Sequence, residues 1–497
     1  MAFKRSAGRS QVRSLRRISF CLAGLAFLAL FIAKIEINTG NPWFELQLMA
    51  QGFTQPSFLS LPTFFNALLT TLAFAFQAVF VAALLGFLMA LCFQNAMVRA
   101  IAAFVRSVHE LFWALLFIQI SGLSSLTGFL ALLIPFSGIF AKVFAEILDE
   151  TDKTAERSLN SRSSYLSKLF YTQIILAWPQ LKSYCRYRLE CAIRSSAILG
   201  FVGLPTLGFE LESFLKQGEY SQAAAILYVF FLLIASLKYW VKIALLPLYA
   251  FVAFLYLPPI ANISWPLVMI FLTQDIVPTS LQQGNALAFY EWLTMMWKTQ
   301  ISYGILNSLV LSQIALICTG LLALIIFPFS SSLFFPKIVR AFGQSGLIII
   351  RSCPEYLLAF MGLLIWGPSM LPAIVALSLH NGAVIAHLLA LQSQTLVFRK
   401  DVCHGVDRYF YEALPRLYGS FIALLLYRWE TILRETAILG MLGIPTLGFY
   451  IDSAFEEIRF DRAILLILVT ALLNILVDNI SRYCRKYIHI KYLPQAL

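Results

Sequence analysis

The chain has 497 residues, of which 60% are hydrophobic and 12% are charged, and its formal net charge is +12. A water-soluble core cannot bury that much apolar surface, so the composition excludes an ordinary soluble protein and indicates a membrane protein. The positive charge does not indicate nucleic-acid binding, because the cations gather at chain ends and short links, where anionic membrane lipid attracts them.

Twelve apolar windows are long enough to cross about 30 Å of hydrocarbon as helices, for which about 20 residues are needed. In the first half of the chain they are 17–36, 64–93, 99–121, 124–147, 175–199 and 221–241. In the second half they are 243–261, 303–331, 344–366, 370–394, 414–439 and 462–481. Backbone polar groups in lipid must be satisfied within their own segment, so we expect an all-α polytopic membrane protein.

Basic residues predict the orientation, because they are retained beside short cytoplasmic loops. They cluster in the N-terminal segment 1–16, in the tail 484–497 and in the central link with Lys238 and Lys242, whereas the opposite loops carry acids such as Glu212 and Asp452. We expect both termini in the cytoplasm of a bacterium and two six-helix halves in its inner membrane, at 17–242 and 243–483. The first apolar window has a basic start but no convincing cleavage site, so we interpret it as a retained span.

The second half repeats the first in sequence. The matching segments are RSVHELF (106–112) with RSCPEYL (351–357), YRLECAIR (187–194) with YRWETILR (427–434), and SAILGFVGLPTLGF (196–209) with TAILGMLGIPTLGF (436–449). An even number of helices in each half gives both copies the same orientation, and the axis between them is the natural place for a pathway.

Charged residues recur inside these apolar windows at equivalent positions. A charge deep in the bilayer costs several kcal/mol unless it faces a partner or water, so it indicates function by default. Glu four residues before Arg is also the favoured order for an ion pair within one helix, so a structural pair remains the alternative to a cationic station for an anion. The candidate pathway residues are Glu190, Arg194, Glu430, Arg434, Arg106, Glu110, Arg351 and Glu355.

The repeated glycine-rich segments predict a gate on the outer side of each half. Glycine permits close backbone approach and non-helical turns, and proline interrupts a helix. The gate candidates are Gly200, Gly203, Pro205, Gly208, Gly440, Gly443, Pro445 and Gly448. A plain connection between two helices is the alternative.

No pattern in the sequence indicates an enzyme. There is no phosphate-binding GxxxxGK[ST] loop and no recognisable nucleophile motif, so we expect no catalytic residue and no cofactor. The eight cysteines lack CxxC or metal-ligand spacing and the five histidines are scattered, so we expect no metal site.

The repeated HELF/CPEYL, YRxExxxR and glycine-rich segments, in this order and spacing, resemble the permease subunits of ATP-binding-cassette importers of the phosphonate type, over about residues 60–240 and 300–488. The resemblance implies a type I importer fold in which two permease chains of six helices are fused into one. It also implies a small anionic solute such as a phosphonate or phosphite, a periplasmic substrate-binding protein, and two copies of a cytoplasmic ATPase subunit that binds ATP and Mg²⁺.

In that family a cytoplasmic loop between the fourth and fifth helices docks on the ATPase through a Glu-Ala, a Gly and an apolar-Pro pair. Here the first loop keeps Glu156 and the second keeps Gly405, Leu414 and Pro415, while Arg157 and Arg162 replace the Ala and Gly of the first loop. These departures suggest that the two halves engage their ATPase partners unequally.

The residues of the first loop independently favour docking, because its apolar side chains recur at helical spacing. The predicted docking face contains Tyr165, Leu166, Leu169 and Phe170. An amphipathic helix lying on lipid is the alternative. For the whole chain, two other functions remain open: a fused permease for another solute such as ferric iron or thiamine, and an ion-coupled secondary transporter. A structural scaffold is disfavoured by the paired charges.

Overall fold

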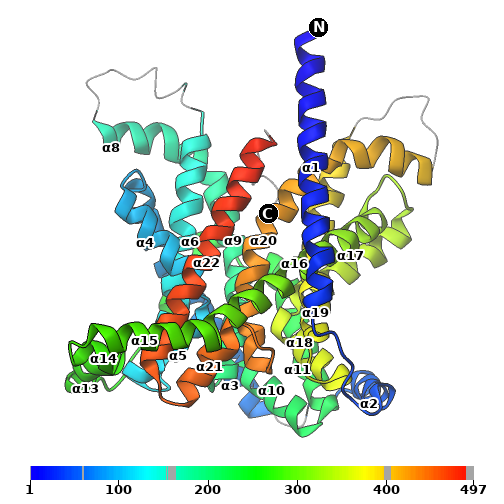
Figure 1. Ribbon diagram of the computed structural model, residues 1–497. Coiled ribbons are helices and arrows are strands. Elements are labelled where there is room, and N and C mark those ends of the chain that lie inside the picture. Colours follow the sequence, from blue (N-terminus) through cyan, green and yellow to red (C-terminus); the bar gives the residue numbers. More distant parts are fainter. Residues whose placement is uncertain (1, 59–60, 153, 155–163, 397–404, 489–497) are drawn as a thin grey trace. The chain divides into compact units, whose positions relative to one another are not determined.

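The computed structural model describes residues 2–58, 61–152, 154, 164–396 and 405–488 (Figure 1). These residues form helices and their connections, and none of them forms a strand. Seven helices are long and apolar enough to cross a membrane, or up to 11 if each pair of sharply bent helices counts as one span. The prediction of an all-α polytopic membrane protein is confirmed.

Contacts divide the chain into two compact units that differ from the halves of the sequence. One unit is Met49–Phe271, and the other combines Met1–Leu48 with Leu272–Ala496. The first helix, α1 (Ala2–Ile32), therefore belongs with the second half of the sequence. The first helix of the second half, α12 (Leu246–Tyr256), belongs with the first half.

The unit Met49–Phe271 is built around α3 (Leu61–Leu91), which packs along α6 (Ser125–Glu150) and against α9 (Ile175–Ile198). Its other elements are α4 (Ala96–Ser107), α5 (Glu110–Ser121), α8 (Tyr165–Lys168), η1 (Leu169–Ile174), η2 (Leu199–Val202), α10 (Leu207–Gln217), α11 (Tyr220–Trp240), η3 (Ile243–Leu245) and α13 (Trp265–Ile270), and α2 (Pro42–Thr54) lies at its boundary. Small residues allow the closest contacts: a Cβ atom added to Gly86 of α3 would lie 2.4 Å from the Cβ atom of Phe140 on α6.

The other unit repeats this plan around α16 (Ser302–Ser330), which packs along α19 (Met370–Ser393) and against α20 (Leu414–Leu439). Its remaining elements are η4 (Phe271–Asp275), α14 (Thr279–Gln282), α15 (Ala286–Met296), η5 (Trp297–Ile301), α17 (Lys337–Ser352), α18 (Glu355–Trp366), η6 (Arg408–Ala413), η7 (Gly440–Leu442), α21 (Leu447–Glu456) and α22 (Phe460–Tyr487).

In each unit a buried glutamine binds the helix that comes from the other half of the sequence. The side-chain nitrogen of Gln313 on α16 donates to the main-chain oxygen of Leu22 on α1 at 2.9 Å. The side-chain nitrogen of Gln77 on α3 donates to the main-chain oxygens of Ala253 and Leu257, at 2.8 and 2.7 Å, at the end of α12. A polar group buried among apolar helices needs such a partner, so these bonds fix where the exchanged helices dock.

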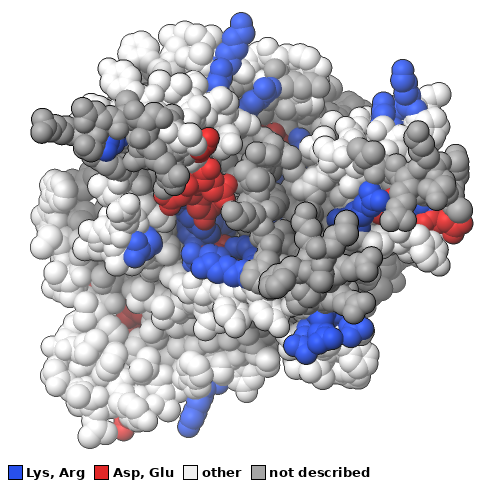
Figure 2. All heavy atoms as spheres, turned by 90° about the horizontal axis from the view of Figure 1, so that it is seen from above, with Lys and Arg blue, Asp and Glu red and all other residues white. Residues whose placement is uncertain are grey.

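The surface agrees with a membrane environment. Many large apolar side chains are exposed, among them Leu232 at 68% and Leu472 at 67%. Seen from above, most of the surface coloured in Figure 2 is uncharged, and the basic and acidic side chains gather in a few places. Exposed large apolar side chains in this number are expected where helices face lipid rather than water.

Three of the predicted spans differ from the structure. The windows 99–121 and 344–366 were expected to be continuous, but α4 and α5 meet at 91° and α17 and α18 at 90°. Extended residues break both helices and form a corner in each half: the first corner joins α4 to α5, and the second corner joins α17 to α18. In the second corner, Pro354 has no N–H with which to continue the helix. The window 243–261 forms a shorter apolar helix, Ile243–Tyr256, because two prolines follow closely at 258 and 259.

Candidate functional site

The first corner brings a carboxylate into the interior of its unit. His109 caps α5, where its Nδ1 accepts a hydrogen bond from the Leu111 amide at 3.2 Å. Glu110 is the first residue of α5 and is 8% exposed. Its carboxylate accepts a hydrogen bond of 2.5 Å from the Ser195 hydroxyl on α9 and lies 3.3 Å from His109 Nε2. The corner motif and the charged helix α9 therefore meet at Glu110.

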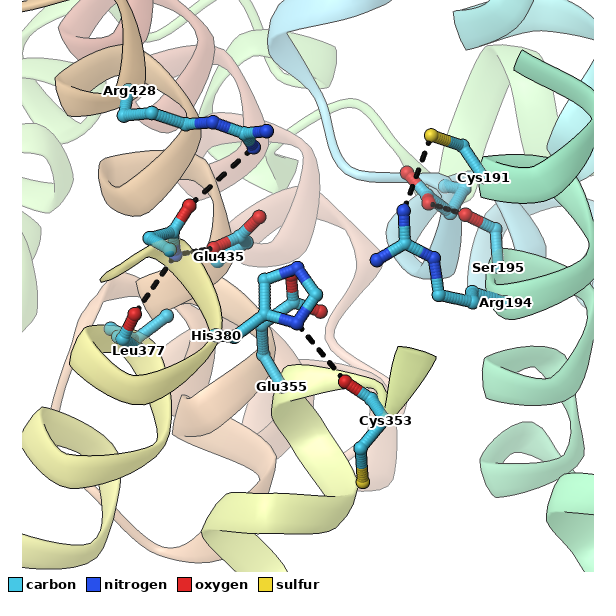
Figure 3. A network of polar contacts seen from close by, with 11 residues as sticks. Cys191, Arg194, Ser195, Cys353, Glu355, Leu377, His380, Arg428 and Glu435 are labelled. Carbon is cyan, nitrogen blue, oxygen red and sulfur yellow. Dashed lines mark hydrogen bonds and ion pairs between the residues drawn. The ribbon is translucent and has the colours of Figure 1, made fainter. Parts of the chain in front are cut away.

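The second corner has the same plan with different partners. Glu355 is the first residue of α18, and its carboxylate lies 2.8 Å from Nε2 of His380 on α19. The Nδ1 atom of His380 lies 3.0 Å from the main-chain oxygen of Cys353, in the corner itself. Figure 3 shows this group together with Glu435 of α20, which accepts a hydrogen bond from the Asn381 side chain at 3.1 Å.

The corners change the interpretation of Arg106 and Arg351. Each lies four residues before Glu110 or Glu355, which would be one helical turn in a continuous helix. The structure separates each Arg from its Glu by a right-angle break, so the two residues of each pair lie on different helices and not one turn apart on the same helix. Arg106 is buried at the end of α4, at 6% exposure, and Arg351 is half-buried in the last turn of α17.

The other four candidates lie one turn apart on α9 and α20. Glu190 and Arg194 on α9 are half-buried, as are Glu430 and Arg434 on α20. One terminal nitrogen of Arg194 lies 3.3 Å from Cys191 Sγ, on the same face of α9 (Figure 3). Because Arg194 directly precedes Ser195, it lies next to the contact between Ser195 and Glu110 within the same unit.

Sequence reasoning missed two arginines and a histidine. Arg188 is 9% exposed, and its guanidinium carbon lies 4.5 Å from the centre of the Phe136 ring, a cation–π geometry. Its repeat, Arg428, donates to Asn381 Oδ1 at 3.5 Å. The signal was present, since both arginines belong to the repeated YR pair, and His380 is one of two histidines in an otherwise uncharged apolar window.

The first gate segment folds back onto the end of α9. After η2 the chain turns at Gly203, where φ is +91°, and α10 continues at an angle of 53° to the preceding helix. An added Cβ atom at Gly208 would lie 1.8 Å from the main-chain oxygen of Ala197, and one at Gly200 would lie 2.1 Å from the Phe209 amide nitrogen. Glycine is therefore required at Gly200 and Gly208 by close approach and is favoured at Gly203 by its backbone angle.

The second gate segment has the same geometry. It turns at Gly443, where φ is +83°. An added Cβ atom would lie 1.6 Å from the main-chain oxygen of Ala437 at Gly448, and 2.1 Å from the Phe449 amide nitrogen at Gly440. Each segment is also hydrogen-bonded to the long central helix of its unit, which is α3 in the first case and α16 in the second. The Leu207 amide donates to Thr71 Oγ1 at 3.0 Å, and the Leu447 amide donates to Ser308 Oγ at 3.1 Å.

The prolines of the gate segments lie in the turns. Pro205 is exposed and Pro445 is half-buried. The main-chain oxygen of Pro445 accepts a hydrogen bond from Asn307 on α16 at 2.8 Å. Both segments are thus fixed loops between two helices, and their role as gates stays a prediction.

The predicted docking residues of the two cytoplasmic loops differ in how exposed they are. Glu156 lies outside the described residues, and Tyr165 and Leu166 form part of α8, with side chains that are not described. Leu169 is 2% exposed, so it does not belong to an exposed docking face, whereas Phe170 is 52% exposed. In the second loop, Gly405 turns with φ of +73°, Leu414 begins α20 as a half-buried residue, and Pro415 follows it as an exposed residue.

An exposed Phe-Tyr pair marks the start of the fifth helix in both halves. Phe170 and Tyr171 in η1 are 52% and 75% exposed, and Phe410 and Tyr411 in η6 are 55% and 82% exposed. The two pairs are separated by 240 residues, which is also the spacing of the repeated YR segments. This repeat was visible in the sequence and was not recognised as a candidate.

Metal-ligating side chains do not cluster in the part of the chain that the structure describes. No group of three His, Cys, Asp or Glu residues there has a geometry that could hold a metal ion. The charged groups of each unit are instead arranged as hydrogen-bonded carboxylates beside arginines. Such an arrangement can stabilise buried charge and can meet an anion through guanidinium groups.

No family model and no solved structure matches the chain. The phosphate-import permease protein PhnE of Mycolicibacterium smegmatis is 24% identical over 426 residues, which cover 79% of this chain and 77% of the relative. The phosphite transport system permease protein PtxC of Stutzerimonas stutzeri is 32% identical over 132 residues, which cover 26% of this chain and 48% of the relative. The first alignment is long enough to include parts of both halves, and the second spans about half of its relative.

Proposed function

We infer that the chain belongs to the permease proteins of ATP-binding-cassette importers of the phosphonate type, and we propose that it forms the membrane pathway for a phosphorus oxyanion. The observation that carries the proposal is the match to a phosphate-import permease along 79% of the chain. A second relative is named for phosphite, and the motifs of the sequence resemble the phosphonate class. These solutes share a tetrahedral phosphorus with charged oxygens.

The charged groups within each unit support an anionic solute. Arg194 and Arg434 occupy equivalent positions on α9 and α20, near the helices α5 and α18 that begin with Glu110 and Glu355. Guanidinium groups bind phosphorus oxyanions well, because their planar N–H donors match two oxygens at once. Nearby carboxylates, such as Glu435 beside Arg434, would stabilise these arginines within the membrane and would have to yield part of that interaction to an entering anion.

ATP hydrolysis belongs, in this proposal, to two copies of a separate cytoplasmic ATPase, which bind ATP and Mg²⁺. The exposed pairs Phe170–Tyr171 and Phe410–Tyr411 are suited to such a partner, since aromatic side chains are enriched at protein interfaces. Each pair lies at the beginning of a helix whose other end meets a gate segment. A push on the pair could thus be carried along α9 or α20 to that segment.

The distribution of basic residues supports an inner-membrane protein with both termini in the cytoplasm. A periplasmic binding protein would then deliver the solute to the opposite side, where the gate segments would lie in this orientation. Because both permease halves are in one chain, each ATPase copy would meet a different loop. This asymmetry supports unequal docking, with the second loop retaining Leu414 and Pro415.

Affinity purification from the native host in mild detergent tests the assembly. Mass spectrometry should find an ATP-binding-cassette ATPase at two copies per chain, together with a periplasmic binding protein when the solute is present. A matched purification of another polytopic membrane protein from the same host controls for non-specific recovery. If the chain is recovered alone under conditions that preserve transport, the importer proposal is wrong.

A further inference from the structure

The amphipathic helices α4 and α17, which come before the two corners, each present exposed apolar side chains. Met97 of α4 is 70% exposed, and Phe342, the equivalent residue of α17, is 77% exposed. Ile338 and Ile349 of α17 are exposed as well. Residues four and seven positions apart lie on one face of a helix, so Ile338, Phe342 and Ile349 form a single exposed row, the α17 stripe.

The helix α17 packs against the end of a membrane-spanning helix. An added Cβ atom at Gly343 would lie 2.6 Å from the main-chain oxygen of Phe329. The side-chain nitrogen of Gln344 donates to the main-chain oxygen of Ser330 at 3.3 Å. Both oxygens belong to the last turn of α16, which has 29 residues where about 20 are enough to span the hydrocarbon. Because α17 also makes an angle of 90° with α18, we place it along the edge of the hydrocarbon rather than across it.

The exposed surface of α16 leads to the α17 stripe. Leu321, Ile325 and Phe329 are exposed and lie four residues apart, so they form one apolar face on the last turns of α16. On a membrane-spanning helix such a face meets acyl chains. The Phe329 ring stacks on the ring of Phe335, two residues before α17, with ring centres 4.9 Å apart. The lipid-facing surface of α16 therefore continues to the first turn of α17.

Two basic residues lie on the other side of the first turns of α17. Successive residues of a helix are about 100° apart, which places Lys337 about 140° and Arg340 about 160° around the helix from Phe342. The sequence from 331 to 354 has no Asp or Glu, and neither have α16 and α19, on which α17 mainly packs. An apolar stripe with uncompensated basic residues on the opposite side is typical of helices that lie in the interface of an anionic membrane.

The first half has exposed apolar residues on α4 but lacks these charges. The residues equivalent to Lys337 and Arg340 are Cys92 and Asn95, which lie 245 residues earlier. Asn95 caps the first turn of α4, where its side chain accepts a hydrogen bond at 2.9 Å. Arg99 of α4 donates to two main-chain oxygens of the preceding turn, at 3.1 and 2.5 Å, so its guanidinium is engaged within the protein. The two halves thus differ in charge at this place.

We propose that α17 binds anionic phospholipid of the inner leaflet, with the α17 stripe among the acyl chains and with Lys337 and Arg340 against the headgroup phosphate. The inner leaflet follows from the orientation in the proposed function, so the inference rests on that function. Each basic residue near an anionic membrane surface strengthens binding about fivefold. Because α17 leads directly to the corner before Glu355, bound lipid holds the corner from which α18 begins.

The test measures which lipid lies against α17 in nanodiscs that contain the full-length chain in equal parts of phosphatidylglycerol and phosphatidylcholine. A trace of one or the other lipid carries a photoactivatable acyl chain, and mass spectrometry quantifies the labelled peptides after illumination. We expect phosphatidylglycerol to label α17 several-fold more than phosphatidylcholine does. The segment of α4 around Met97 is the internal control, since both lipids should label it about equally.

The double variant with Lys337→Gln and Arg340→Gln should lose this preference at α17, while labelling by phosphatidylcholine remains. Lys298→Gln is the matched control, because it removes an exposed basic residue from η5 in the same unit, and the preference at α17 should be unchanged in it. A higher salt concentration should reduce the preference of the native chain, since salt screens the attraction between exposed charges.

Equal labelling of α17 by the two lipids overturns the inference, as does a preference that survives in the double variant. Absence of lipid label on α17 also overturns it and would leave a protein such as the ATPase as the partner of the α17 stripe. The measurement needs neither ATPase nor solute, so a failure of the importer proposal would leave the labelling pattern intact. A failure of this inference would in turn leave ATP-driven uptake intact.

Discussion

Replacing Gly448 with alanine tests the tight crossing between the second gate segment and the end of α20. The added Cβ atom would lie 1.6 Å from the main-chain oxygen of Ala437 and 2.5 Å from its carbonyl carbon, whereas real Cβ contacts are essentially never shorter than 3.0 Å. The two segments would have to separate by about 1.4 Å, and main-chain atoms cannot rotate aside as a side chain can. Overpacking costs about 1–3 kcal/mol, and we expect the upper end of that range here.

The measurement is the thermal unfolding midpoint of the purified chain in detergent. A loss of about 3 kcal/mol in a unit of this size should lower the midpoint by about 6–12 °C. Gly346→Ala is the matched control, because Gly346 lies within α17 and has no atom within 4 Å of the added Cβ. Alanine favours a helix by about 1 kcal/mol over glycine, so the control should be unchanged or slightly more stable. Equal midpoints for the two variants would refute the close-approach argument.

Replacing Gln313 with leucine removes the amide that binds the Leu22 carbonyl, so α1 should separate more easily at a cost of about 1 kcal/mol. Limited trypsin digestion of the N-terminal basic segment should then be faster, and an unchanged rate would contradict this role. Changing Arg194 and Arg434 together to glutamine should abolish solute uptake while the complex with the ATPase stays intact; undiminished uptake would remove both from the pathway. Tyr411→Ala should lower the amount of ATPase recovered with the chain several-fold, since exposed aromatic residues contribute strongly to interfaces. Equal recovery would leave lipid as the partner of Tyr411.

Hydropathy was sufficient to predict most of the helices, because about 20 apolar residues in a row have few alternatives in a membrane. It failed at the corners, because one window averaged an amphipathic helix, α4 or α17, with the more apolar helix that follows it, α5 or α18. Pro354 was a local signal in the second corner, but the first corner depends on capping by His109 and contains no proline. The exchange of α1 and α12 between the units was also invisible, because it is a matter of tertiary contacts rather than of periodicity.

The sequence predicted the charged residues of the candidate site, but it did not predict the residues that they contact. Repetition in both halves identified Glu110 and Glu355, but Ser195 and His380 occur singly and differ between the halves, so repetition could not identify them. The predicted docking face placed Leu169 beside Phe170 at the surface, but Leu169 is 2% exposed while Phe170 is 52% exposed. Helical spacing in the sequence cannot tell which of two neighbouring apolar residues the rest of the unit covers.

ATP-dependent uptake into proteoliposomes tests the central claim most directly. The chain would be reconstituted with its copurified ATPase, with ATP and Mg²⁺ enclosed in the lumen and the binding protein and radiolabelled phosphite, phosphonate or phosphate outside. The account predicts accumulation of at least one of these anions that requires both enclosed ATP and the binding protein, and that is lost in the variant with glutamine at both Arg194 and Arg434. Accumulation that follows an imposed ion gradient and proceeds without ATP would contradict it and would identify the chain as a secondary transporter.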